Sequence, residues 1–148
     1  MKIIHLCLSN FYIDGYAYQE NQLIAEHVRA GHDVFVLAST ETFDKDGQLT
    51  YLQTKTYMGA DGAMVTRLPY RFNAFPFFAK KLRSYDGLMD CLIRINPDVI
   101  VFHGLCAWDL LVVAEYCRSR PSVLFYADSH EDFNNSARSF LSKWGLHY

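Results

Sequence analysis

Residues 2–39 read KIIHLCLSNFYIDGYAYQENQLIAEHVRAGHDVFVLAS, and this stretch decides the fold. Residues 3–8 form an apolar run without alternation, which is typical of a strand buried on both faces. Residues 18–30 place apolar side chains at helical spacing and are followed by Gly31, a residue type that commonly ends helices. Residues 33–38 form a second apolar run. The order strand, helix, strand predicts two parallel strands joined by a crossover helix.

The same alternation continues along the chain. Strands are predicted at 63–68, 99–102 and 123–127, helices at 75–95, 107–118 and 137–144, and a short hairpin between 50–52 and 55–58. Buried strands alternating with helices predict an α/β fold, with residues 1–148 as a single domain. Right-handed crossovers favour the strand order 3-2-1-4-5, which is a Rossmann-like, doubly wound, mainly parallel sheet with helices on both faces.

Composition narrows the class of protein. The 148 residues are 51% hydrophobic and 20% charged, which indicates a globular chain, and the net charge of −2 gives no reason to expect a nucleic-acid partner. The apolar run at the N-terminus is short and lacks a cleavage site, and no stretch is long enough to span a membrane, so we expect a cytoplasmic protein. No CxxC pair occurs, and reduced thiols are expected at all four cysteines: Cys7, Cys91, Cys106 and Cys117.

Polar residues follow the predicted strands. Ligands of open α/β sheets bind beyond the carboxyl ends of the strands, where the strand order reverses. His103 and Gly104 follow the fourth strand, and residues 128–132 (DSHED) follow the fifth. His103 could bind a ligand or merely satisfy a backbone carbonyl. His130, with three carboxylates within two residues, could act in acid–base chemistry, bind a metal or lie in a solvated loop, but its spacing lacks a metal-ligand pattern, so we expect no metal.

The other histidines carry weaker signals. His5 lies in the middle of a predicted strand and His32 follows a helix-ending glycine, so both are interpreted as structural. His27 lies on the apolar face of the predicted helix and is interpreted as packing. No GxGxxG fingerprint, Walker A motif or nucleophile elbow is present, which argues against a dinucleotide cofactor.

Several segments together resemble the N-terminal domain of GT-B glycosyltransferases of family 4. The segment KIIHLCLSNF, the glycine at 15 and the turn GHDV at 31–34 are similar to the start of that family. DGAMVTRLPYR at 61–71, PDVIVFHG at 97–104 and VLFYADSHEDF at 123–133 are similar to three later family segments, in the same order. The resemblance covers essentially the whole chain.

The resemblance implies a two-domain enzyme. The domain given by residues 1–148 would hold a glycan or lipid-linked acceptor, and a C-terminal domain outside this chain would bind the nucleotide-sugar, which is a co-substrate rather than a cofactor. The isolated chain is then expected to be inactive. It would also expose the face that its partner domain covers, so a homodimer through that face is an expectation.

The resemblance also assigns site residues by position. Gly15 matches the family's glycine loop near the donor diphosphate, and Tyr16 stands where many members have a second glycine. His130 matches a histidine at the reaction centre, which makes it the candidate catalytic residue, and His103 matches one near the acceptor pocket. The remaining substrate-binding candidates are Tyr18, Glu20, Glu131 and Asp132. If the reaction needs a protein base, the segment 128–132 offers Asp128, His130, Glu131 or Asp132.

Residues 68–85 combine cations with aromatic side chains, a composition typical of segments that contact anionic membranes. The alternative is an ordinary helix that covers the sheet; sedimentation with anionic vesicles at low and high salt distinguishes the two. Two other functions stay open from sequence alone: a non-catalytic, doubly wound binding module, and a fragment of a GT-B-like sugar-nucleotide epimerase.

Overall fold

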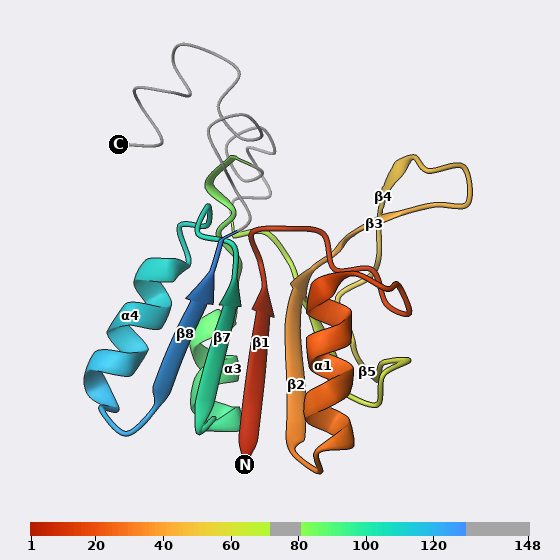
Figure 1. Cartoon of the computed structure of the whole chain (residues 1–148). Helices are drawn as coiled ribbons and strands as arrows, with labels where there is room; N and C mark the ends of the chain where they lie inside the picture. The colour runs from red at the N-terminus through yellow and green to blue at the C-terminus, as the bar shows by residue number, and fades with distance from the viewer. Residues whose placement is uncertain (72–80, 130–148) are drawn as a thin grey trace.

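The computed structural model describes residues 1–71 and 81–129 (Figure 1). The elements run in the order β1 (Lys2–Cys7), α1 (Gln19–Arg29), β2 (Asp33–Ser39), β3 (Glu41–Phe43), β4 (Leu49–Tyr51), β5 (Thr56–Met58), β6 (Met64–Leu68), α3 (Leu88–Ile95), β7 (Val99–His103), α4 (Leu110–Ser119) and β8 (Leu124–Asp128).

One sheet organises the described residues. Its six strands lie in the order β5-β6-β2-β1-β7-β8, and every pair is parallel except β5 with β6 at one edge. The five parallel strands follow the predicted order 3-2-1-4-5, so the predicted α/β class and the mainly parallel sheet are confirmed. The arrangement is consistent with a Rossmann-like fold.

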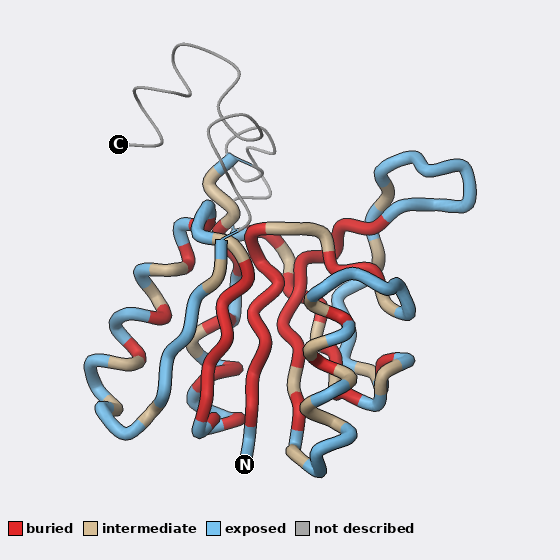
Figure 2. Tube along the Cα trace, viewed as in Figure 1, coloured by how far each residue is buried: buried red, intermediate tan, exposed pale blue. Residues whose placement is uncertain are grey.

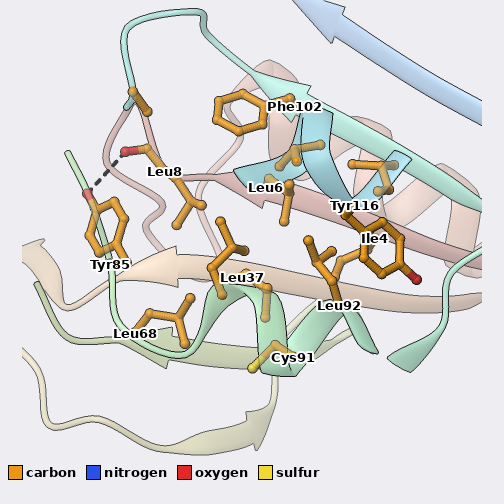
Figure 3. Close-up of a cluster of buried hydrophobic side chains, with 14 of the residues drawn as sticks. Ile4, Leu6, Leu8, Leu37, Leu68, Tyr85, Cys91, Leu92, Phe102 and Tyr116 are labelled. Carbon is orange, nitrogen blue, oxygen red and sulfur yellow. Dashed lines mark hydrogen bonds between the residues drawn. The ribbon is translucent and has the colours of Figure 1, made fainter. Parts of the chain in front are cut away.

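Helices lie on both faces of the sheet (Figure 1). Side chains of β1 alternate between the faces, so Ile4 and Leu6 belong to the cluster that includes α3 and α4, whereas Cys7 belongs to the cluster that includes Ile24 of α1. Figure 2 shows the central strands buried along almost their whole length. Leucine, isoleucine and aromatic side chains fill the larger cluster on the α3 and α4 side (Figure 3).

The predicted hairpin between 50–52 and 55–58 is wrong. β4 pairs instead with β3, and the turn between them is held by Asp44, whose Oδ1 accepts the N–H groups of Asp46 and Gln48. β5 pairs antiparallel with β6. The pairing of these short strands is therefore determined by the turns between them. An Asx turn joins β3 to β4, and a glycine-containing turn joins β5 to β6.

The predicted continuous helix over 75–95 is also wrong in its described part. Residues 81–82 and Leu88–Ile95 are helical, but residues 83–87 between them are not. Arg83 and Gly87, at the two ends of this interruption, have left-handed backbone conformations. The carboxylate of Asp109 accepts a hydrogen bond from the Ser84 hydroxyl (3.0 Å) and one from the Tyr85 N–H (2.9 Å). These contacts hold residues 84–85 outside the helix, with Tyr85 in an isolated β-bridge to Tyr70, which helical periodicity alone cannot foresee.

The helix predicted at 107–118 is observed at Leu110–Ser119, because residues 107–109 form the turn that positions Asp109. The predicted helix at 137–144 and residues 72–80 of the cationic, aromatic segment lie outside the described residues. In the part that is described, no helix is long and apolar enough to cross a membrane. Of the four cysteines, Cys7 and Cys91 are buried, Cys117 is partly buried and Cys106 is exposed.

Two buried tyrosines offer a matched test of the hydrogen bond that joins Tyr85 to Leu8, the residue after β1. The Tyr85 hydroxyl donates to the carbonyl oxygen of Leu8 at 3.0 Å, whereas the buried Tyr116 hydroxyl has no hydrogen-bond partner among the residues described. Tyr85→Phe leaves a buried carbonyl without that donor and is expected to lower the free energy of unfolding by about 1–3 kcal/mol. Tyr116→Phe removes no hydrogen bond and should change it by less than about 0.5 kcal/mol.

Chemical denaturation of the wild type and both variants measures this difference. Equal effects of the two substitutions would contradict the assigned hydrogen bond.

Candidate functional site

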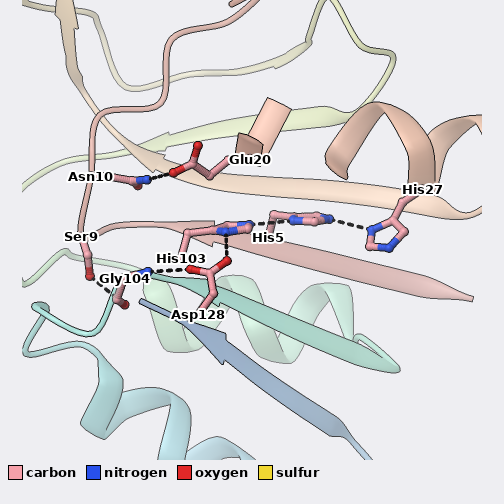
Figure 4. Close-up of polar contacts among 8 residues, drawn as sticks. All are labelled: His5, Ser9, Asn10, Glu20, His27, His103, Gly104 and Asp128. Carbon is pink, nitrogen blue, oxygen red and sulfur yellow. Dashed lines mark hydrogen bonds and ion pairs between the residues drawn. The ribbon is translucent and has the colours of Figure 1, made fainter. Parts of the chain in front are cut away.

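Polar side chains converge where the carboxyl ends of β1, β7 and β8 meet (Figure 4). Parallel pairing of β1 with β7 brings the loop after β1 beside the end of β7, and the register of β7 with β8 sets His103 level with Asp128. The strand order reverses between β1 and β7, since β2 lies on the other side of β1. We refer to Ser9, Asn10, Glu20, His103, Gly104 and Asp128 as the edge cluster.

A close backbone approach closes one side of the edge cluster. The Ser9 hydroxyl donates to the Gly104 carbonyl oxygen at 3.1 Å, and the Gly104 N–H donates to Asp128 Oδ1 at 3.2 Å. Gly104 has a φ of +80°, and a Cβ at this position would lie 2.8 Å from the Ser9 Cβ. Position 104 therefore requires glycine for two reasons: its backbone is left-handed, and a side chain there would collide with Ser9.

His103 and Asp128 form the ionisable pair of the edge cluster. The His103 Nδ1–H donates to Asp128 Oδ2 at 2.8 Å, and the two side chains are 2% and 31% exposed. His103, a predicted substrate-binding residue, is thus buried with both ring nitrogens in contact with neighbours. Asp128 is the member of the pair that reaches solvent.

A row of histidines continues from this pair beneath α1. His103 Nε2 lies 2.9 Å from His5 Nδ1, and His5 Nε2 lies 3.0 Å from His27 Nδ1 (Figure 4). The rings of His5 and His103 are stacked, with centroids 5.2 Å apart. Each contact uses a different nitrogen, so the rings form a row rather than a cage, and the described residues contain no group of side chains that could hold a metal ion.

Burial controls the charge of this row. Loss of hydration first, and then the neighbouring His103 and His27, together lower the pKa of His5 from its usual 6.5 to about 3, because burial disfavours the charged ring and adjacent imidazolium ions repel. The pKa of His27 is lowered as well, first by burial and then by His32 and His103. His5 is therefore neutral at physiological pH.

Asn10 and Glu20 form the other side of the edge cluster. The Asn10 side-chain amide donates to Glu20 Oε1, which turns Asn10 Oδ1 away from the carboxylate. That oxygen is buried and has no hydrogen-bond partner among the described residues. A buried acceptor without a partner costs free energy that a ligand hydroxyl or amide could recover. Glu20, one of the predicted substrate-binding residues, thus takes part in the edge cluster through Asn10.

The predicted glycine loop lies elsewhere. Gly15 has a φ of +77° and faces Ala60, whose N–H donates to Asp14 Oδ1 at 2.9 Å. Tyr16 and Tyr18 expose about half of their surface, 51% and 49%, with ring centroids 5.5 Å apart. Figure 1 shows this loop on the α1 and β5 side of the sheet, away from the ends of β7 and β8. The structure therefore does not bring Gly15 next to His103.

Sequence reasoning assigned His5 and His27 to structure and packing and so missed the row. The signal that could have found it is the alternation of side chains along paired strands. Once β1 and β7 are paired in register, His5 and His103 lie on the same face of the sheet. Asp128 is one of three acids that follow the fifth predicted strand, and sequence alone does not distinguish it from the other two. The predicted catalytic residue His130, together with Glu131 and Asp132, lies outside the described residues.

No protein-family model matches the chain, and neither does any curated protein. Function therefore has to be argued from the edge cluster and the fold around it.

Gly104→Ala tests the close approach in the edge cluster. The substitution forces a left-handed alanine and a contact with Ser9, so we expect a loss of roughly 3 kcal/mol in the free energy of unfolding. Gly31→Ala is the matched control, since Gly31 has a φ of +79° but no atom within 4 Å of its added Cβ. It should cost only about 1 kcal/mol.

Denaturant unfolding of the two variants measures the difference, and adding Ser9→Gly to Gly104→Ala should recover the part caused by the contact. Equal losses for Gly104→Ala and Gly31→Ala would contradict the close approach.

The lowered pKa of His5 predicts a dependence of stability on pH. Between pH 6.5 and the folded-state value of about 3, the unfolded chain binds a proton at His5 that the folded chain does not. The resulting stability is present above pH 6.5 and is lost as the pH falls, by about 1.4 kcal/mol per pH unit. Lowering the pH to about 5 should therefore remove about 2 kcal/mol more from the wild type than from His5→Leu, in which His27 still contributes a loss of the same sign.

Urea unfolding across this pH range measures both profiles. Parallel profiles for the wild type and His5→Leu would contradict the buried, neutral state of His5.

Proposed function

We propose that this chain is the acceptor-side domain of a nucleotide-sugar-dependent glycosyltransferase of the GT-B type. In this proposal the sheet is the doubly wound N-terminal half of the enzyme, and a separate domain binds the nucleotide-sugar. A hexosyl group passes to a glycan or a lipid-linked acceptor, and the chain alone binds the acceptor without turnover.

The observation that carries the proposal is the convergence of the edge cluster at the reversal of strand order between β1 and β7. Open α/β sheets bind their ligands at this place, because the loops after neighbouring strands diverge there to opposite faces and leave a crevice. The resemblance of five segments to family 4 transferases supports the same placement, since one of those segments ends at His103–Gly104 and another contains Asp128.

Asp128 is assigned the central role within the edge cluster. Its Oδ2 accepts from His103 and its Oδ1 from Gly104, so its carboxylate is held in a fixed orientation while its side chain remains 31% exposed. A fixed carboxylate suits an acceptor hydroxyl, which donates its proton as its oxygen bonds to the anomeric carbon and the bond to the leaving diphosphate breaks. His130, Glu131 and Asp132 follow directly in sequence and remain candidates for contacts to the same group.

The exposed rings of Tyr16 and Tyr18 are assigned to an outer part of the acceptor. Tyrosine presents an apolar face together with a hydroxyl, which suits a sugar ring with its own apolar face and hydroxyl rim. Because the loop that carries these two tyrosines lies on the α1 and β5 side, they would contact a different sugar unit from the one at Asp128.

Titration of the chain with ligands tests the proposal. We expect oligosaccharides or lipid-linked sugars to shift the amide NMR signals of Gly104 and Asp128, and nucleotide-sugars to leave them unchanged. Asp128→Asn should weaken acceptor binding about tenfold, which is about 1.4 kcal/mol, because a charged acceptor is lost. Asp98→Asn is the matched control, since its carboxylate binds the backbone of Lys2 at the opposite end of β7.

Two results would overturn the proposal. If no sugar in a broad panel binds, the chain is better explained as a binding module for another class of ligand. If sugars bind but Asp128→Asn and Asp98→Asn act alike, the edge cluster is not the acceptor site.

A further inference from the structure

The row of histidines has a direction that its hydrogen bonds impose. A carboxylate only accepts hydrogen bonds, so His103 must place a proton on Nδ1 to donate to Asp128 Oδ2. The Nε2 of a neutral His103 is then an acceptor, and the nitrogen 2.9 Å away, His5 Nδ1, must be its donor.

The same reasoning carries on to the helix. A neutral His5 that donates from Nδ1 accepts at Nε2, so His27 donates from its own Nδ1 across 3.0 Å. All three rings therefore carry their proton on Nδ1, and every hydrogen bond points toward Asp128. Free histidine prefers the Nε2–H form, so this uniform state is a consequence of the carboxylate at one end.

We propose that Asp128, His103, His5 and His27 form one directional proton relay, in which a proton bound at the outer nitrogen of His27 is transferred from ring to ring and is held on His103 beside Asp128. The relay is a property of this chain that goes beyond the proposed transferase and does not depend on it.

The transfer balances without any further reactant. A proton from water forms a bond to His27 Nε2, and the His27 Nδ1–H bond breaks as that proton moves to His5 Nε2. The His5 Nδ1–H bond then breaks as its proton moves to His103 Nε2. His103 ends as an imidazolium that still donates from Nδ1 to Asp128, while His5 and His27 end as neutral Nε2–H rings.

The surroundings favour His103 as the resting place of the proton. It is the one ring of the row that contacts a carboxylate, at 2.8 Å, and an imidazolium there keeps its Nδ1–H bond to Asp128 as a charge-assisted hydrogen bond. His5 is fully buried, and the pKa values of His5 and His27 are both lowered. The entry point is His27, which is half-buried, whereas His5 and His103 are 0% and 1% exposed.

The other ionisable groups around the row are hydrogen-bonded to other partners, lie at its outer end or stay neutral. On α1, Glu20 accepts from Asn10, and Glu26 pairs with Arg29. The His32 ring lies 6.1 Å from the His27 ring and opposes a charge there. On β1, Cys7 is buried, and burial raises its pKa, so it stays a neutral thiol.

The consequence lies at the edge cluster. Without the extra proton, His103 and Asp128 together carry one negative charge, and with it they are a neutral ion pair. The charge beside a bound ligand is thereby set by a proton that enters at His27 of α1. The fully buried ring of His5 separates this entry point from the edge cluster.

Nitrogen NMR of the ¹⁵N-labelled, 148-residue chain tests the relay, because ¹⁵N–¹H correlations through two and three bonds distinguish N–H, lone-pair and imidazolium nitrogens. At about pH 8 we expect the Nδ1–H form in His5, His27 and His103. On acidification His103 should become the first imidazolium, as His5 and His27 change to the Nε2–H form. An imidazolium that forms first at His27 would overturn the proposal.

Asp128→Asn gives a second test at the far end of the row. The Gly104 N–H fixes the amide oxygen of Asn on its own side, so the amide nitrogen must donate to His103 Nδ1. All three rings should then change to Nε2–H at about pH 8, including His27, whose ring does not touch residue 128. Asp98→Asn, which removes the same charge at the other end of β7, should change none of them.

His5→Phe removes the middle ring of the row and serves as the control background for Asp128→Asn. In this background Asp128→Asn should no longer alter the tautomer of His27. An unchanged His27 in folded Asp128→Asn, or a change that persists with His5→Phe, would overturn the relay. If Asp128→Asn does not fold, the titration of the wild type decides alone. None of these measurements uses activity, so a failed relay and a failed transferase proposal are separate outcomes.

Discussion

The parallel pairing of β1 with β2 on one edge and with β7 on the other is the constraint on which the rest of the structure depends. A strand paired on both edges and covered on both faces has to be apolar throughout, and β1 is buried from Ile3 to Cys7. Because the strand order reverses at this strand, the loops after β1 and β7 meet at one edge of the sheet. The edge cluster exists because that pairing places Ser9 against Gly104.

Polar groups inside the fold are accommodated by complete hydrogen bonding. His5 is an imidazole in the middle of the central strand, and both of its nitrogens have partners from other elements. Asp109 is buried in the same way, and its carboxylate accepts from Ser84 and from Tyr85. Burial raises the pKa of Asp109, so these hydrogen bonds offset part of the cost of holding a carboxylate there. Both residues join segments that are distant in sequence, and so they specify positions that apolar packing alone would leave open.

Local patterns predicted most of the sheet strands correctly. They predicted poorly the segments whose conformation depends on a polar contact or on a turn. The strands β1, β2, β6, β7 and β8 were identified from their apolar runs alone. The burial expected for the last of these runs is not observed, because β8 lies at the edge of the sheet and is largely exposed among the described residues. The helix expected through residues 83–87 failed because Asp109, more than twenty positions later, holds residues 84–85 in another conformation. The predicted hairpin is wrong because β4 and β5 are short, exposed strands whose own sequences favour neither partner, so the turns that flank them determine the pairing.

The sequence by itself determined the α/β class, the order of the parallel strands and the edge of the sheet at which polar residues gather. These follow from period, burial and the handedness of crossovers, which are local or general rules. Only the tertiary structure decided that His5, His27 and His103 form one row, and that the loop at Gly15 lies apart from it. The physical reason is that such contacts depend on the register of paired strands and on the seating of α1 against them. His5 and His103 are 98 positions apart, and no local preference of either residue reports their separation of 2.9 Å.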